Sequence, residues 1–310
     1  MDLELSLSNA KVLILGGSGF IGTSLTKAFL EFNSKVTVVS TASSQIGKTN
    51  ENLTQIKHDF EKGPCDEIKK NNYDFIINCS GYIDHSDYLV NGPNIIKNQL
   101  FVLFNIIDSI KNKKFKKFIQ IGSSDEYGQN IAPQTEGQRE SPSTPYGFAK
   151  SASTHFIQML VRNIDFPAIV LRPFLIYGPG QKMDRFVPYA VKNCLNKNNF
   201  HITDGKQIKD FIYIDDFIEI VFCSIFSSNA MNGRIFNVTS GNPISIKEVV
   251  DLIQKICNGG NPIFGSKRIP KKENKNLYAE LDYVKSSLNW EPKITIEEGL
   301  LKVVNYMKKL

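Results

Sequence analysis

The stretch KVLILGGSGFIG, residues 11–22, decides the fold of this chain. Its first five residues, Lys11–Leu15, have the apolar pattern of a buried strand. Apolar residues then recur at helical spacing from Ile21 to Phe32. A glycine-rich turn between a buried strand and a helix is typical of a site for a dinucleotide phosphate. We therefore expect the chain to begin with the first strand, turn and helix of a dinucleotide-binding fold.

Three of the four glycines in this turn have separate expected roles. Gly16 permits a tight turn, Gly19 lets the backbone approach a pyrophosphate, and Gly22 lets the helix pack on the strand. The N–H groups and the positive dipole end of the helix would then face the phosphates. The other motif residues expected at the cofactor are Ser18, Phe20 and Ile21.

Strand and helix patterns alternate over the first 175 residues, which predicts parallel strands joined by helical crossovers. We expect a Rossmann-type doubly wound α/β fold with a parallel sheet covered on both faces. The regular alternation of strand and helix patterns ends after Gly178, which indicates a second, smaller domain of mixed strands and helices. The first predicted domain, which binds the dinucleotide, spans residues 1–175, and residues 211–240 return to it. The second predicted domain spans mainly residues 176–310. The predicted strands are Lys35–Val39, Gln55–His58, Asp74–Cys79, Lys117–Gly122 and Ala168–Arg172, and helices are predicted near Asn94–Lys111 and Tyr146–Asn163.

Composition excludes several other classes of protein. The five Cys form no CxxC pair and the four His have no ligand spacing, so we expect no metal site. No signal peptide precedes Lys11 and no apolar run reaches the roughly 18 residues of a membrane helix, which favours a cytoplasmic protein without a membrane partner. The basic run Lys111–Lys117 is interpreted as a solvated helix end and not as a nucleic-acid site, and the net charge of +6 suits an anionic substrate.

The end of the second strand bears on the choice of cofactor. Folds that prefer NAD usually place an Asp or Glu there, on the ribose 2′-OH. This chain has Ser40-Thr41-Ala42-Ser43-Ser44 instead, and Lys48 follows. No carboxylate would repel a 2′-phosphate, so Ser40 and Thr41 favour NADP, with NAD as the alternative.

Three further residues predict acid–base chemistry. Tyr146 and Lys150 are four apart on a predicted helix and share one face of it. An ammonium group beside a phenol favours the phenolate, and the phenol can then exchange a proton with a sugar hydroxyl or ketone. Ser123 follows the strand Lys117–Gly122, and ligands bind at the carboxyl ends of such strands. Ser123 should therefore face the same crevice as the glycine turn.

The chain resembles the extended short-chain dehydrogenase/reductase family, which comprises nucleotide-sugar epimerases, dehydratases and reductases. The matching segments cover nearly the whole chain in the expected order. They are GGSGFIG (16–22), HDF (58–60), NCSG (78–81), IGSSDEYG (121–128), PYGFAK (145–150), LRPFLIYGPGQ (171–181), KDFIYIDD (209–216), FNVTSGNPISI (236–246) and LNWEPKITIEEGL (288–300).

The resemblance implies a role for each matching residue. Tyr146 is the acid/base, Lys150 lowers its pKa and holds the nicotinamide ribose, and Ser123 binds the reacting sugar oxygen. Lys209 stands where the family often has an Arg that reaches the diphosphate, and Leu175 stands where it often has an Asn. Around the cofactor, Asp59 and Phe60 would flank the adenine, Cys79, Ser80 and Gly81 would lie beside it, and Pro173 would border the nicotinamide. The family also implies a homodimer, built through the helices near Asn94–Lys111 and Tyr146–Asn163, and a nucleotide-sugar domain over 176–310.

The residues between Ser123 and Tyr127 bear on the reaction. A dehydratase needs a carboxylic acid and a carboxylate beside the catalytic Ser or Thr, but Ser124 and Asp125 occupy those two positions here. The pattern is closer to reductases that act on GDP-4-keto-6-deoxymannose. We expect reduction at C4 of an NDP-4-keto-6-deoxyhexose, with Ser124 and Asp125 at the substrate. A 4-epimerase, a 4,6-dehydratase and a non-catalytic NADP-binding protein remain alternatives. His85 and Asp87 fall in a loop near the crevice, where they either contact substrate or are solvated.

Overall fold

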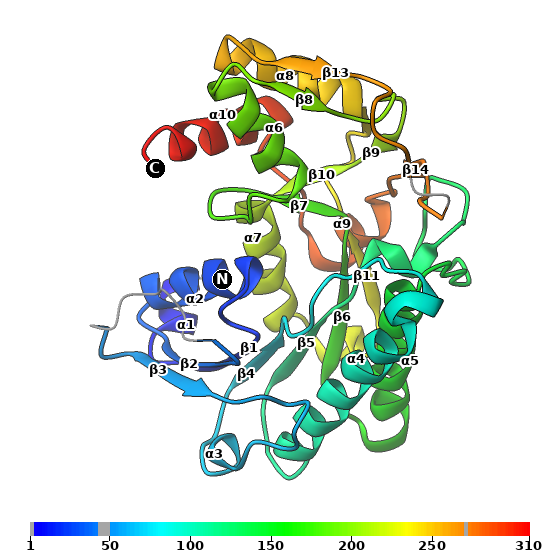
Figure 1. Ribbon diagram of the computed structural model, residues 1–310. Helices are drawn as coiled ribbons and strands as arrows, with labels where there is room; N and C mark the ends of the chain where they lie inside the picture. The colour runs from blue at the N-terminus through cyan, green and yellow to red at the C-terminus, as the bar shows by residue number, and fades with distance from the viewer. Residues whose placement is uncertain (1–2, 43–49, 270–271) are drawn as a thin grey trace. The chain divides into compact units, whose positions relative to one another are not determined.

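The computed structural model describes residues 3–42, 50–269 and 272–310 (Figure 1). The chain divides into two compact units. Unit 1 comprises Met1–Glu126, Pro142–Arg172 and Val221–Phe236, and unit 2 comprises Tyr127–Ser141, Pro173–Ile220 and Asn237–Leu310. The chain thus passes between the two units several times.

A seven-stranded sheet organises unit 1, in the order β11-β6-β5-β4-β1-β2-β3. Strands β1 to β6 pair in parallel. Strand order reverses between β1 and β4, and in such sheets ligands bind outside the carboxyl ends of the strands at this reversal. The expected Rossmann-type sheet is therefore confirmed. Its strands are β1 (Lys11–Leu15), β2 (Lys35–Ser40), β3 (Leu53–Lys57), β4 (Phe75–Asn78), β5 (Lys117–Ile121), β6 (Ala168–Pro173) and β11 (Ile235–Val238).

Helices cover this sheet, as the apolar strands require. Every residue of β4, β5 and β6 is buried, so both faces must be covered. Helices α4 and α5 pack on each other, with the rings of Phe104 and Phe156 4.8 Å apart. The helical segments are α1 (Leu3–Leu7), α2 (Phe20–Glu31), α3 (Asp66–Lys69), α4 (Tyr88–Ile110), η1 (Ser124–Tyr127), α5 (Pro145–Ile164), α7 (Ile214–Ile225, which begins in unit 2) and η2 (Asn229–Met231).

Helix α4 begins at Tyr88, earlier than the predicted start near Asn94. Gly92 and Pro93, both poor residues for a helix interior, stand just before the predicted start. Pro93 nevertheless lies inside α4, close to its N-terminal end. At that position the missing N–H costs one bond of the second turn, and the helix continues.

Unit 2 contains short strands and amphipathic helices. The pairs β7–β10 and β8–β13 are parallel, and β9 lies between β12 and β14. Capping boxes start α8 at Ser245 and α10 at Thr295. The strands are β7 (Leu175–Tyr177), β8 (Asn199–His201), β9 (Ile208–Lys209), β10 (Phe211–Tyr213), β12 (Ile244–Ser245), β13 (Asn261–Ile263) and β14 (Asn276–Leu277), and the helices are α6 (Phe186–Leu195), α8 (Ile246–Cys257), α9 (Asp282–Leu288) and α10 (Ile296–Met307).

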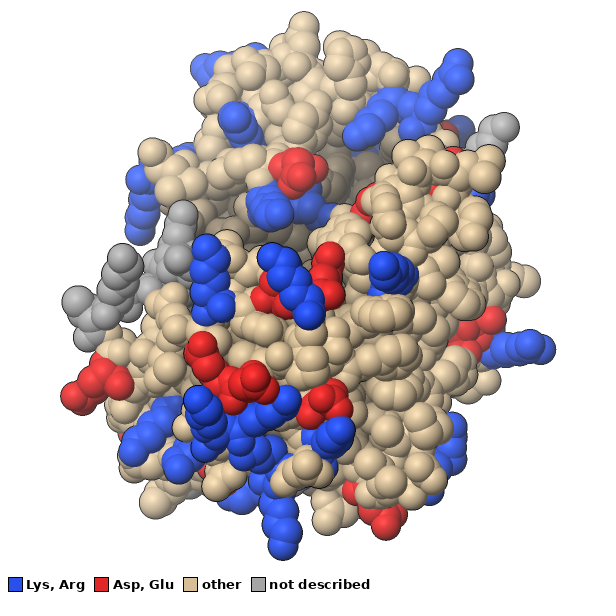
Figure 2. All heavy atoms as spheres, turned by 60° about the horizontal axis from the view of Figure 1, so that its bottom comes forward, with Lys and Arg blue, Asp and Glu red and all other residues tan. Residues whose placement is uncertain are grey.

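Surface charge is mixed in sign. On the face shown in Figure 2, Lys and Arg side chains lie among Asp and Glu side chains. Within the basic run, Lys111 pairs with Asp108, and Lys116 lies 3.2 Å from Asp74. Lys117 differs from the solvated residues expected there, because it is buried and donates to Asn232 Oδ1 at 2.7 Å. Within the described ranges, no helix is long and apolar enough to span a bilayer.

Candidate active site

The glycine turn lies at the carboxyl end of β1, directly before α2. Gly16 has a φ of +79°, and a Cβ there would lie 2.7 Å from the Cys79 carbonyl oxygen, so only glycine fits. A Cβ on Gly22 would lie 2.5 Å from the Gly16 oxygen. Gly19 is the N-cap of α2, and no side chain caps the helix there. Its first N–H groups are thus available to an anion, and this turn fits the pyrophosphate of a dinucleotide.

The residues expected around the ribose and adenine follow β2 and β3. Ser40 ends β2, and its hydroxyl donates to the Ala42 carbonyl oxygen at 2.5 Å. Asp59 is partly exposed and accepts from the Glu61 N–H at 3.0 Å. The Phe60 ring lies in the hydrophobic core, 4.7 Å from the His58 ring. Ser43, Ser44 and Lys48, which follow in the sequence, lie outside the described residues.

Cys79, Ser80 and Gly81 follow β4 and lie against the glycine turn. A Cβ on Gly16 would lie 2.8 Å from the carbonyl carbon of Cys79 and 2.8 Å from the Cα of Ser80. Burial raises the pKa of the Cys79 thiol to about 12, although the charge of Lys150 opposes this shift. Cys79 is therefore a neutral side chain next to the expected cofactor site. Gly81 has a φ of +109° and faces the Gln99 side chain, which excludes a larger residue there.

Helix α5 holds Tyr146 and Lys150. The Thr144 hydroxyl accepts from the Gly147 N–H at 3.0 Å, and Pro145 occupies the first turn. Both Tyr146 and Lys150 are buried, at 4% and 6% exposed. The Lys150 ammonium lies 5.9 Å from the centre of the Tyr146 ring and donates to the Ile121 carbonyl oxygen at 3.1 Å. The two side chains are therefore neighbours on one face of α5.

Electrostatics around Lys150 act in two directions. Burial lowers the pKa of its ammonium group, while Glu126, Cys79 and Asp125 raise it. A lysine in a dry environment interacts more strongly with a nearby phenolate than a solvated one does.

Ser123 follows β5 and is linked to Asp125. The Ser123 hydroxyl donates to Asp125 Oδ2 at 3.2 Å and accepts from the Asp125 N–H at 3.1 Å. Ser124, also expected at the substrate, starts η1 and is only 5% exposed. Within this segment, Asp125 presents the more accessible polar side chain, at 35% exposed.

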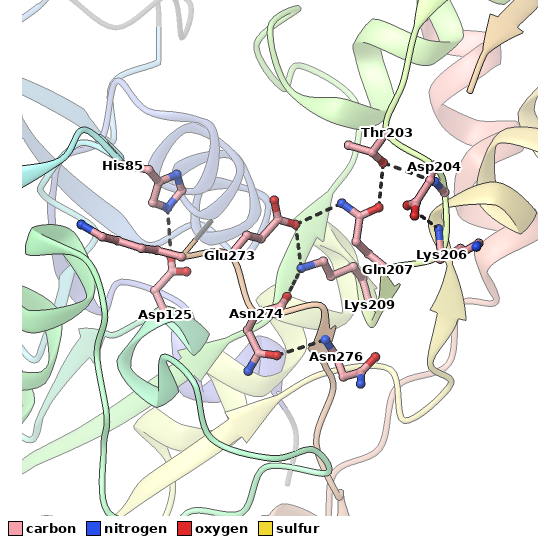
Figure 3. Close-up of polar contacts among 12 residues, drawn as sticks. His85, Asp125, Thr203, Asp204, Lys206, Gln207, Lys209, Glu273, Asn274 and Asn276 are labelled. Atoms are coloured by element: carbon pink, nitrogen blue, oxygen red, sulfur yellow. Dashed lines mark hydrogen bonds and ion pairs between the residues drawn. The ribbon is translucent and has the colours of Figure 1, made fainter. Parts of the chain in front are cut away.

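His85 joins this group from the loop after β4 (Figure 3). Its Nε2 lies 3.2 Å from Asp125 Oδ2, and its ring meets the Tyr146 ring edge-on at 5.5 Å between centroids. Sequence reasoning left this residue undecided between substrate contact and a solvated loop. The available signal was its position shortly after the carboxyl end of β4, at the edge of the sheet where ligands bind.

Glu126 is fully buried and contacts this group through the Ser123 backbone. Its carboxylate accepts from Arg172 at 2.7 Å, from the Thr154 hydroxyl at 2.8 Å and from the Ser123 N–H at 2.8 Å. Both side chains of the Arg172–Glu126 pair are 0% exposed. Glu126 is thus part of the scaffold that holds Ser123, and only Asp125 of these two acids can reach a ligand.

Unit 2 contains Lys209, expected at the diphosphate. Its ammonium lies 3.0 Å from Glu273 Oε1 and donates to the Asn274 carbonyl oxygen at 2.6 Å (Figure 3). Pro173 ends β6, and Leu175 starts β7 and pairs with Phe211. Sequence reasoning missed a hollow of about 210 Å³ next to this pair. It is lined by Leu175, Ile176, Tyr177, Gln181, Asp184, Arg185, Phe186, Val187 and Phe211.

No cluster of three or more metal-binding side chains occurs in the part of the chain that the structure describes. The polar groups collected above are instead hydroxyl, phenol, imidazole, ammonium and carboxylate groups. Such a set can bind a sugar oxygen and move a proton to or from it.

Comparison with known proteins assigns the family. Residues 12–239 match the group described as the NAD dependent epimerase/dehydratase family. The chain belongs to this family. Membership confirms the expected extended short-chain dehydrogenase/reductase, an NAD(P)-dependent enzyme that modifies nucleotide sugars.

Individual relatives are distant. The chain is 28% identical over 276 residues to dTDP-D-glucose 4,6-dehydratase from Dictyostelium discoideum, a match over 80% of this chain and 62% of that protein. It is 29% identical over 208 residues to UDP-glucuronate 4-epimerase from Thermodesulfobacterium geofontis, over 66% of this chain and 63% of that protein. Among solved structures, Pal from Bacillus thuringiensis superimposes with a TM-score of 0.87 at 26% identity, covering 96% of this chain and 99% of Pal.

Proposed function

We propose that this family member reduces the C4 ketone of an NDP-4-keto-6-deoxyhexose. The observation that carries the proposal is the burial of Glu126 against Arg172. Removal of water across C5–C6 would need an acid and a base beside Ser123. Glu126 is held in the scaffold, so this segment offers Asp125 alone. Reduction at C4 needs no second carboxyl group, because a phenol supplies the single proton.

Each residue of the group has a role in this reaction. Tyr146 gives its phenolic proton to the developing C4 oxyanion, and Ser123 donates a second hydrogen bond to it. Lys150 stabilises the phenolate that Tyr146 becomes. The reduced nicotinamide, when bound, supplies the hydride. Asp125 orients Ser123 and a sugar hydroxyl.

NADPH is the proposed reductant. A reductase consumes reduced cofactor in every turnover, and the end of β2 offers Ser40 and Thr41 with no carboxylate to repel a 2′-phosphate. The family description names NAD, which remains the alternative. A cytoplasmic location fits a consumer of NADPH whose five cysteines are all free thiols.

Unit 2 is proposed to bind the nucleotide. Lys209 would exchange Glu273 for the diphosphate, and its single ammonium offers a point charge in place of the bidentate fork of an arginine. The hollow beside Phe186 and Phe211 has aromatic walls that suit a planar base. Both groups belong to unit 2, so this role does not depend on unit 1.

A 4-epimerase is the second candidate. One relative is named UDP-glucuronate 4-epimerase, and Ser123, Tyr146 and Lys150 could equally oxidise C4 and reduce it again. Another relative is named a 4,6-dehydratase, but the buried Glu126 argues against that chemistry here. A non-catalytic NADP-binding protein is disfavoured, because such a protein has no use for the three catalytic side chains.

The experiment uses two assays on purified protein. The first offers dTDP-glucose, GDP-mannose or UDP-glucose alone, and the second offers dTDP-4-keto-6-deoxyglucose or GDP-4-keto-6-deoxymannose with NADPH. We expect the second assay to consume NADPH and the first to give no keto-sugar. Interconversion of 4-epimers without added cofactor would replace reduction by epimerisation.

A homodimer through α4 and α5 is also proposed. Large apolar side chains on these helices are exposed, although both helices bury their other faces. Phe101 and Phe104 on α4 are 50% and 42% exposed, and Phe148 and Met159 on α5 are 48% and 40% exposed. Light scattering should report a dimer that Phe101→Asp makes monomeric. Leu301→Asp, at a residue on α10 that is 48% exposed, should leave the dimer intact.

A further inference from the structure

The His85–Asp125–Ser123 chain of polar contacts connects a buried hydroxyl with solvent. Ser123 is 9% exposed, while the Asp125 and His85 side chains are 35% and 52% exposed. Asp125 Oδ2 contacts both neighbours, at 3.2 Å from Ser123 Oγ and 3.2 Å from His85 Nε2. Exposure thus rises at each step away from the catalytic serine.

We infer that His85 is the group through which protons from solvent return to the active site after each turnover. The inference rests on the proposed reduction, because that reaction takes up one proton per turnover. Tyr146 loses its proton to O4 and must regain one before the next substrate reacts. Epimerisation returns every proton it borrows and would need no such supply.

The proton moves in balanced steps. Protonated His85 gives the Nε2 proton to the Asp125 carboxylate. Asp125 passes a proton to Ser123 Oγ as the Ser123 hydroxyl gives its own proton to the Tyr146 phenolate. His85 then takes a proton from water. One proton enters from solvent, the phenol is restored, and Asp125 and Ser123 end as they began.

The charges around His85 suit this role. Asp125 faces it from η1, the Tyr146 ring faces it from α5, and Asp84 precedes it in its own loop. Asp84 is held by hydrogen bonds from Ser86 and Asn91, and the charge of His85 acts on it as well. The imidazole is thus held between the Asp125 carboxylate and the edge of the Tyr146 ring, on a path from Ser123 to solvent.

The test follows NADPH oxidation with dTDP-4-keto-6-deoxyglucose or GDP-4-keto-6-deoxymannose, whichever the wild type reduces. In His85→Gln the first turnover should be as fast as in the wild type, because Tyr146 starts protonated. Later turnovers should be slower by about 100-fold, which is the low end of the effect of a proton-transfer group. The trace should therefore show a burst equal to the enzyme concentration, with KM little changed. Added imidazole should restore the steady-state rate of His85→Ala.

The control is His201→Gln, at an exposed histidine on β8, which should give wild-type traces. A His85→Gln enzyme with wild-type steady-state turnover would overturn the relay while leaving the reduction intact. An equal loss in the first and later turnovers, without rescue by imidazole, would mean that His85 acts only by positioning Asp125. If the wild type reduced neither keto-sugar, the proposed function would fail and the relay with it.

Discussion

The guanidinium of Arg172 lies 2.7 Å from the carboxylate of Glu126, and both side chains are fully buried. Asp125, one residue earlier, faces Ser123 and His85 instead. The side chains of Asp125 and Glu126, which are adjacent in the short helix η1, therefore lie in different environments. Glu126 supports the scaffold behind Ser123, and Asp125 belongs to the proposed reactive group.

Glu126→Gln should destabilise the protein strongly. It leaves the buried Arg172 charge without its counterion, and breaking such a pair costs about 3–5 kcal/mol. Urea unfolding should show the loss in the free energy of unfolding. Asp125→Asn is the matched control, and because Asp125 is partly exposed we expect about 1 kcal/mol or less for that change. Equal stability of Glu126→Gln and the wild type would contradict the scaffold role.

Local patterns were enough to predict one part of the site. The glycine turn follows from a strand, four glycines and a helix within 11–32, and the Tyr146–Lys150 pairing follows from helical periodicity. The partners of Glu126 and Asp125 did not follow. Arg172 is 46 residues from Glu126 and His85 is 40 residues from Asp125, so their contacts depend on which strands become neighbours. The spacing of residues along the sequence does not predict contacts between residues this far apart in the chain.

Tyr146→Phe should lower the rate of the chemical step by about 100-fold or more, which is typical for loss of an acid–base group. The ring and its packing remain, so the dinucleotide dissociation constant should stay within a few-fold of the wild-type value. Single-turnover kinetics and cofactor titration measure the two quantities. Tyr306→Phe, at a partly exposed position on α10, is the control. Near-normal chemistry in Tyr146→Phe would remove Tyr146 from its assigned role.

Lys150→Ala should impair both the rate and cofactor binding. The buried ammonium, 5.9 Å from the centre of the Tyr146 ring, is expected to stabilise the Tyr146 phenolate and to hold the nicotinamide ribose. We expect kcat to fall with a rise in the cofactor dissociation constant, whereas Lys192→Ala on the exposed face of α6 should change neither. A slower enzyme with unchanged cofactor affinity would contradict the ribose contact.

The cofactor preference should favour NADPH over NADH. Ser40 and Thr41 place hydroxyl groups and no carboxylate at the end of β2. Titration of the wild type with each reduced cofactor measures the two dissociation constants. A tenfold preference for NADH, about 1.4 kcal/mol, would reject the assignment and would also weaken the case for a reductase.

Asp125→Asn separates the three reactions. In a dehydratase this carboxylate would take the proton from C5, so its neutralisation should abolish formation of a 4-keto-6-deoxy sugar. In a reductase Asp125 orients Ser123 and the sugar, and its loss should cost about 1.5–3 kcal/mol, the range for a hydrogen bond to a charged group. Asparagine keeps the shape and one acceptor oxygen, so Ser123 can still be held.

Both assays are run on the wild type and on Asp125→Asn, with His201→Gln as the control. We expect NADPH oxidation with keto-sugar in all three proteins, slower in Asp125→Asn, and no keto-sugar from the unoxidised sugar nucleotide. The burial of Glu126 is the reason, because dehydration would leave Asp125 to serve as both acid and base. A wild type that makes keto-sugar without added cofactor, and an Asp125→Asn variant that does not, would make the protein a dehydratase.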